Sequence, residues 1–134
     1  MIRRPWLVFA SERVREEWHS GKLPPILVMV VEKIADARWR ELDVTTVITS
    51  IWRSRAEEKA AGAKHLVHFD YRGVDLAADP FSRPAEDRIR DSINLCFPTG
   101  IATMPRVAPL DHKGKLHYHA QATKAEAKRK EGQK

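Results

Sequence analysis

The chain has 134 residues, of which 43% are hydrophobic and 31% charged, and its formal net charge is +6. This size and composition are typical of one globular domain with a hydrophobic core of its own. Its single cysteine, Cys96, excludes an intrachain disulfide and a multi-cysteine zinc site, so a metal ion would need histidine and carboxylate ligands.

Neither a secretory signal nor a membrane helix is predicted. The first six residues contain two arginines but lead into no long apolar segment. The longest apolar run, residues 24–31, is far shorter than the roughly 20 residues that a membrane helix needs. We therefore expect a protein that is made in the cytoplasm and has no membrane span.

Two helices are predicted in the first third of the chain. Residues 9–18 are typical of a short helix with Ser11 as its N-cap. A longer helix is predicted from residue 26 to about residue 40, because apolar residues recur there at intervals of three and four. Trp39 continues this apolar face, and the charged residues, including Arg38, lie mostly off it.

The β-branched run of residues 44–49 predicts a strand that ends in a polar loop carrying Arg53. Such a loop can point an arginine into a site, although a surface arginine is the alternative interpretation. A short helix over residues 56–63 and a strand around residues 72–76 are predicted to follow.

The remaining predicted elements are a helix and two strands. Residues 84–97 form an amphipathic pattern, with Leu95 or Cys96 and also Phe97 expected to face the core. Residues 101–110 contain two prolines and are at best an edge strand, and residues 115–121 form the final strand. We expect Cys96 to be buried, as unpaired cysteines usually are.

This order of elements predicts an α+β fold with a small, mainly antiparallel sheet flanked by helices. The predicted domain covers residues 1–123. Residues 124–134 contain five basic and two acidic residues, which is half of the net charge. We expect a flexible, solvated helical tail there, and attraction to an acidic polymer is the alternative.

Two histidines near the C-terminus and an earlier histidine–aspartate pair are candidate metal ligands. His117 and His119 lie two residues apart in a predicted strand, so their side chains share a face. His68 and Asp75 are joined by a loop-to-strand passage that lets His68 turn back toward Asp75. Two imidazoles and a carboxylate form a ligand set typical of catalytic zinc, although surface or packing histidines are the alternative for each pair alone.

The other histidines are assigned lesser roles. His65 is expected to be a packing or surface residue, with a ligand role as the minor alternative. His112 lies in a loop before the last strand and is a plausible wall of the site. His19 ends the first helix, where a cation complements the helix dipole, and is taken as structural.

Together, these motifs resemble the D-alanyl-D-alanine carboxypeptidase-type zinc peptidases, which have a hedgehog-like fold and include bacteriophage L-alanyl-D-glutamate endolysins. In chain order the motifs are Ser50-Ile51-Trp52-Arg53-Ser54, His68 followed by Asp75 seven residues later, and Leu116-His117-Tyr118-His119. The resemblance covers roughly residues 10–121. The chain departs from the family pattern at Leu66, Tyr71 and Gly73, where the family has serine, glycine and alanine.

The resemblance implies a role for each matching residue. The implied zinc ligands are His68, Asp75 and His119, the implied catalytic residues are Arg53 and His117, and the implied substrate contacts are Ser50, Tyr71 and His112. Many members carry a glutamate base three residues before the last ligand. Leu116 occupies that position here, so His117 would serve beside the metal instead.

The function implied by the resemblance is zinc-dependent hydrolysis of a peptide bond in the stem peptide of peptidoglycan. Zinc would activate a water molecule for attack on the carbonyl carbon. Peptidoglycan and virion proteins are the expected partners, and the protein would act on the cell wall after release or within a phage particle. No nucleic-acid partner is expected, because aromatic and basic residues are not interleaved. A non-catalytic zinc-binding or cell-wall-binding module of the same fold is the alternative.

Overall fold

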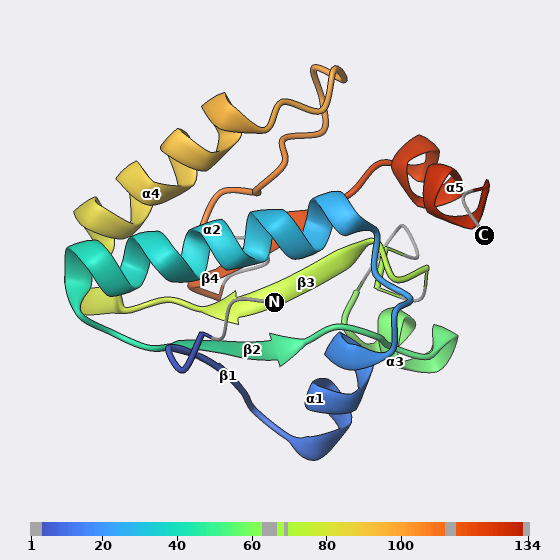
Figure 1. Ribbon diagram of the computed structural model, residues 1–134, viewed down its shortest axis with the longest axis horizontal. Coiled ribbons are helices and arrows are strands. Elements are labelled where there is room, and N and C mark those ends of the chain that lie inside the picture. Colours follow the sequence, from blue (N-terminus) through green and yellow to red (C-terminus); the bar gives the residue numbers. More distant parts are fainter. Residues whose placement is uncertain (1–3, 63–66, 69, 112–114, 133–134) are drawn as a thin grey trace.

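The computed structural model describes residues 4–62, 67–68, 70–111 and 115–132 (Figure 1). In chain order the elements are β1 (Leu7–Phe9), α1 (Glu12–His19), α2 (Pro25–Leu42), β2 (Thr46–Ser50), α3 (Arg55–Ala60), β3 (Gly73–Ala77), a 3-10 turn (Pro80–Ser82), α4 (Arg83–Cys96), β4 (His117–Gln121) and α5 (Lys124–Gly132). No helix in the described part of the chain is long and apolar enough to span a membrane.

The strands form one sheet in the order β1-β2-β3-β4. The α+β class and the small sheet flanked by helices are confirmed. The sheet is mixed, because β1 pairs in parallel with β2 while β3 is antiparallel to both of its neighbours. β1 was not predicted, since residue 9 was assigned to the first helix, whereas that helix begins only after its N-cap, Ser11.

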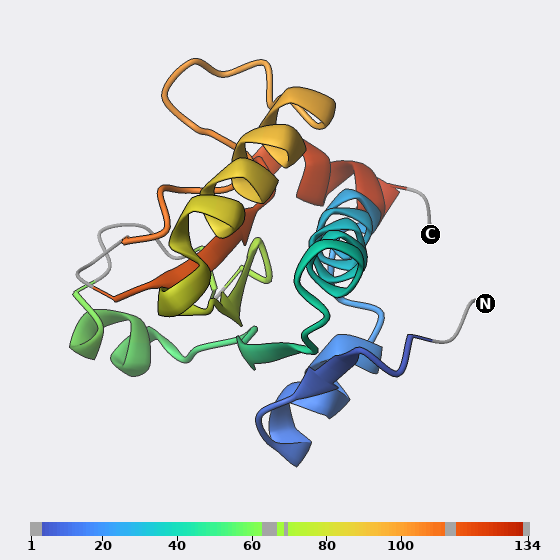
Figure 2. The same ribbon diagram turned by 90° about the vertical axis from the view of Figure 1, so that its left-hand side faces the viewer.

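The hydrophobic core lies between the sheet and α2, which crosses one face of the sheet with α4 beside it (Figures 1 and 2). Side chains alternate between the two faces of a strand. Val74 and Leu76 on β3, with Tyr118 and Ala120 on β4, therefore share the core face, and all four are fully buried. On each of these strands, the residue between the two named ones points to the opposite face, where the candidate site lies.

A buried ion pair joins the helices to the sheet on the core side. Arg38 of α2 donates to both carboxylate oxygens of Glu86 of α4, at 2.9 and 3.0 Å, and to Thr46 of β2 at 2.8 Å. The Tyr118 hydroxyl donates to Glu86 at 2.8 Å. The prediction that Arg38 lies off the buried face is therefore wrong. Trp39, predicted to continue that face, is 41% exposed and stacks on Trp6.

Two further predictions fail near the end of α4. Leu95 is 84% exposed and Cys96 is also exposed, so neither packs into the core. The helical period explains the exposure of Leu95, because Ile89 and Ile93 define the buried stripe and the second position after Ile93 lies on the opposite side of the helix. Cys96 is the last residue of α4, and its exposure does not follow from the helical period. Phe97, just after the helix, does pack against the core as predicted.

The segment from residue 101 to residue 110 follows the outer edge of β4 without forming a strand of its own in the described residues. Val107 makes an isolated antiparallel bridge with Ala120. The main chain of Leu110 accepts from His117 at 2.7 Å, and Ala108 donates to His119 at 3.0 Å. The predicted edge strand is thus reduced to a bridge with a few ladder-like hydrogen bonds, as expected for a segment with two prolines.

Candidate metal centre

Two of the three predicted metal ligands face each other across neighbouring strands. Asp75 of β3 lies directly opposite His119 of β4 in the antiparallel register. Both side chains point to the sheet face away from α2, because Leu76 and Tyr118 occupy the core face. Pairing of β3 with β4 is therefore sufficient to bring an imidazole against a carboxylate.

The third ligand reaches the site from a tight turn before β3. The main-chain N–H of Tyr71 donates to the His68 carbonyl at 3.1 Å, and that of Arg72 donates to Val67 at 2.8 Å. This turn reverses the chain and places His68 beside Asp75, as the sequence predicted. Tyr71 has φ of 56°, a left-handed conformation that favours glycine.

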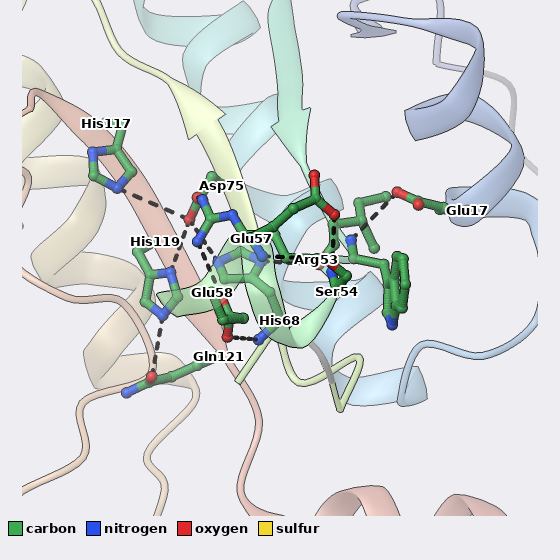
Figure 3. A network of polar contacts seen from close by, with 12 residues as sticks. Glu17, Arg53, Ser54, Glu57, Glu58, His68, Asp75, His117, His119 and Gln121 are labelled. Carbon is green, nitrogen blue, oxygen red and sulfur yellow. Dashed lines mark hydrogen bonds and ion pairs between the residues drawn. The ribbon is translucent and has the colours of Figure 1, made fainter. Parts of the chain in front are cut away.

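Three donor atoms converge at this point (Figure 3). His119 Nδ1 lies 2.8 Å from Asp75 Oδ1, and His68 Nε2 lies 3.4 Å from the same oxygen. One ligand atom from each residue lies within 4.8 Å of the others, and the residues are only 3–6% exposed. This buried group of His68, Asp75 and His119 could hold a metal ion.

Each histidine of the group has a hydrogen-bonding partner on the side of its ring away from Asp75. His68 Nδ1 lies 2.8 Å from the Ile51 carbonyl oxygen, and His119 Nε2 lies 3.2 Å from Gln121 Oε1. Both partners are hydrogen-bond acceptors, so each outer nitrogen can carry the proton of a neutral ring. With a metal ion bound, the inner nitrogens would then present lone pairs to it, an arrangement that is usual for histidine ligands of metals.

Asp75 is held as a carboxylate whose two oxygens have different partners. Burial by itself would raise its pKa, but hydrogen bonds and charge from His119 and His68 hold the pKa well below its usual range. Asp75 Oδ1 faces the histidines, whereas Oδ2 accepts from Arg53 Nη2 at 2.8 Å. One oxygen is thus left for a metal ion.

Arg53 and His117, the two predicted catalytic residues, both lie at the site. Arg53 comes from the loop after β2 and reaches Asp75, as predicted for an arginine at a strand end. His117 shares a face of β4 with His119, and its Nε2 lies 3.9 Å from Asp75 Oδ1. Its Nδ1 lies 2.8 Å from the Lys115 carbonyl oxygen, which orients the ring. His117 is not a member of the close group of three.

The predicted substrate contacts are placed less centrally. Ser50 is half-buried on β2 and lies opposite Asp75 in the sheet register. The Tyr71 ring stacks on Trp52 at a centroid distance of 6.3 Å. His65 and His112 lie outside the described residues. His19 ends α1 with its ring against Phe9, in agreement with a structural role.

Two residues of the site were missed from the sequence. Gln121 lies two positions after His119, so the alternation of a strand could have placed it on the same face. Glu58 is buried on α3 and bonds both Arg53 and the main chain of His68. The capping box of Ser54 and Glu57 could have located the start of that helix, but not its inward face.

Comparison with known proteins gives no relative from which to infer function. No family model, no curated protein and no solved structure matches the chain. What is established is the α+β fold and a buried group of two histidines and an aspartate on one sheet face.

Proposed function

We propose that the protein is a zinc-dependent peptidase that cleaves a peptide bond in the stem peptide of peptidoglycan. The observation that carries this proposal is the convergence of His68 Nε2, Asp75 Oδ1 and His119 Nδ1 in a buried group. Two nitrogen donors and one carboxylate oxygen suit zinc, and catalytic zinc sites commonly use three protein ligands and leave a fourth position open.

An open position is what distinguishes a catalytic zinc site from a structural one. Among the described residues, the group that can share one ion has three members. His117 is the next imidazole along β4 and faces the same carboxylate from 3.9 Å. This arrangement supports a role for His117 beside the open position instead of as a fourth ligand.

The choice of substrate rests on the motif resemblance to the D-alanyl-D-alanine carboxypeptidase-type zinc peptidases. Of two departures from that family pattern, one keeps the local backbone conformation and the other alters the packing beside the rings. Tyr71 stands at a family glycine and has positive φ, so the backbone retains a glycine-like conformation. Gly73 stands at a family alanine and lies beneath the imidazole rings of His68 and His119. A hedgehog-like fold belongs to the same proposal.

Each polar residue of the site has a proposed task. Bound zinc would supply an activated water molecule and polarise the scissile carbonyl. His117, 18% exposed and fixed through the Lys115 carbonyl, is placed to move a proton to the leaving amine. Arg53 holds Asp75 as a one-oxygen ligand and adds positive charge beside the carbonyl.

The test measures metal content and cleavage separately. Wild-type protein should bind one zinc ion per chain by elemental analysis and release muropeptides from purified sacculi, as detected by mass spectrometry. His119→Ala should lose both properties, and chelation should abolish cleavage by the wild type. His19→Ala, which removes an exposed imidazole from α1, is the matched control and should keep both. Muropeptide release by metal-free protein would refute the proposal.

A non-catalytic module that binds zinc and cell wall is the second candidate. The favouring observation is Leu116, which stands where many members of the resembled family carry a glutamate base and instead packs against the core. Sacculus binding in a sedimentation assay, combined with stoichiometric zinc and no released muropeptides, would support this module over the enzyme.

A further inference from the structure

Glu58 is a buried carboxylate behind the candidate metal centre. Its side chain is 1% exposed and comes from α3, an element that supplies none of the three metal ligands. Burying a carboxylate costs several kcal/mol unless charged and hydrogen-bonding partners compensate. The partners of Glu58 therefore indicate why an acidic residue is kept there.

One carboxylate group is connected to two of the three ligands (Figure 3). Glu58 Oε1 lies 3.2 Å from Arg53 Nη1, and Arg53 Nη2 donates to Asp75 Oδ2 at 2.8 Å. Glu58 Oε2 accepts from the main-chain N–H of His68 at 3.2 Å. The loop that carries His68 and the carboxylate of Asp75 are thus tied to the same side chain.

The start of α3 is fixed in a way that directs Glu58 inward. Ser54 and Glu57 form a capping box, in which each side chain bonds the main-chain N–H of the other. Glu58 N donates to the Ser54 carbonyl at 2.9 Å, which completes the first helical turn. Glu57 and Glu58 are consecutive, yet Glu57 faces solvent and Glu58 faces Arg53.

The charges around the centre also depend on Glu58. Arg53 lies between two carboxylates, Asp75 and Glu58, so this group of three carries one net negative charge. Without Glu58, the positive charge of Arg53 would cancel that of Asp75 and weaken the attraction for a divalent cation. Glu58 therefore contributes both position and charge.

We propose that Glu58 is a positioning residue that braces Arg53 and the main chain of His68 and thereby sets the zinc affinity of the centre. This inference rests on the metal centre of the proposed function. The chief role of Arg53 is then to hold Asp75, because the guanidinium of Arg53 bridges two carboxylates.

The test is the zinc dissociation constant of Glu58→Gln, measured by competition with a chromophoric chelator in the absence of substrate. Loss of an outer partner of a metal ligand typically weakens binding 10- to 100-fold, and we expect at least a tenfold loss. Glu57→Gln is the matched control. It alters the adjacent exposed carboxylate while keeping a capping box, and its zinc affinity should stay within about twofold of wild type.

A double-mutant cycle separates bracing from a general loss of stability. If Glu58 acts through Arg53, Glu58→Gln should weaken zinc binding much less in an Arg53→Gln background than in the wild type. If Glu58→Gln does not fold, Arg53→Lys tests the same brace. Lysine cannot bridge the two carboxylates in the geometry of a guanidinium, so zinc affinity should fall by a similar factor.

Wild-type zinc affinity in Glu58→Gln or Arg53→Lys, or fully additive effects in the cycle, would overturn the inference. Zinc binding is read without substrate, so the result is distinct from that of the cleavage assay. A protein that binds zinc tightly through Glu58 but releases no muropeptides would support the brace and refute the peptidase. A wild type that binds no zinc would refute both.

Discussion

Gly73 is the residue over which the two histidines of the candidate metal group meet. A methyl group built at its Cα would lie 3.1 Å from His119 Cε1, 3.4 Å from His68 Cε1 and 2.7 Å from Val67 Cγ1. The last distance is shorter than side chains tolerate. The absence of a side chain at Gly73 therefore allows the two rings to approach to a centroid distance of 5.3 Å.

Gly73→Ala should weaken zinc binding because Val67 and at least one imidazole must move. We expect a loss of about tenfold in affinity, or about 1.4 kcal/mol, measured by chelator competition. Gly100→Ala is the control, since nothing lies within 4 Å of a methyl group there but φ is 78°. That variant should lose stability through backbone strain and keep its zinc affinity. Equal zinc affinity in Gly73→Ala and wild type would contradict the prediction.

At the scale of residues, the sequence placed the candidate ligands together better than it predicted their surroundings. The alternation of β4 correctly placed His117 and His119 on one face, because a two-residue period depends only on the strand. The position of Glu58 could not be predicted, because it depends on how α3 packs against the loop carrying Arg53. Arg38 was placed off the apolar face although it follows Ile34 by four residues, and its burial depends on Glu86, a partner from another helix.

At the scale of elements, α5 follows shortly after β4. Its charged sequence is typical of a solvated helix, yet its first turn is attached to the rest of the fold. Glu126 forms a bidentate ion pair with buried Arg106, in which Nη1 and Nη2 donate to the two carboxylate oxygens at 2.6 and 2.8 Å. Glu126 also accepts from the Thr123 N–H, and Thr123 Oγ1 accepts in return, which is a capping box. The start of α5 is thus attached to the segment that runs along β4.

This attachment should make stability depend on pH. Burial would raise the pKa of Glu126, but hydrogen bonds from Arg106 and Thr123 hold it below its usual range. A lowered folded-state pKa means that the stabilisation is complete above the unfolded value of about 4.3 and is lost as pH falls through the folded value. Glu126→Gln, which can keep the capping box, should therefore melt below wild type at pH 7, and the difference should shrink below about pH 4.

The matched control for this prediction is Glu16→Gln on α1, which changes an exposed carboxylate. Its melting temperature should follow that of the wild type at both pH values. A difference between Glu126→Gln and wild type that stays constant from pH 7 to pH 3 would show that the charge of Glu126 does not stabilise α5.

Most elements were predicted from sequence, and the two longest helices had the clearest patterns. α2 and α4 were found because each repeats its apolar positions over several turns. β1 was missed because it has three residues and lies at a sheet edge, where pairing with β2 defines it more than its own pattern does. Thr123-x-x-Glu126 is a capping signal that could have located the start of α5.

At the scale of the whole molecule, the two faces of the sheet have different tasks. The core face carries the hydrophobic residues and the buried pair of Arg38 and Glu86, which connects α2, α4 and β2. The opposite face carries Asp75 and His119. Tyr118 lies between the two histidines of β4 in sequence, but its hydroxyl bonds Glu86 on the core side. Stability and metal binding should therefore be separable by mutation.

Arg38→Met tests this separation. Removing one partner of a buried ion pair leaves the other charge uncompensated and typically costs 3–5 kcal/mol, so the free energy of unfolding in urea should fall by about that amount. At a temperature where the variant remains folded, its zinc affinity should match wild type, because Arg38 is on the core side. Arg40→Met, at an exposed position of the same helix, should change neither quantity.

The double variant Arg38→Met/Glu86→Leu identifies the cause of the loss. If the cost comes from the unpaired carboxylate, removing it as well should recover part of the stability, although Tyr118 and the Asp79 N–H then lose an acceptor. Recovery of stability together with unchanged zinc affinity would locate the ion pair in the scaffold alone. A tenfold fall in zinc affinity in folded Arg38→Met would instead show that the two sheet faces are coupled, with β4 as the strand that belongs to both.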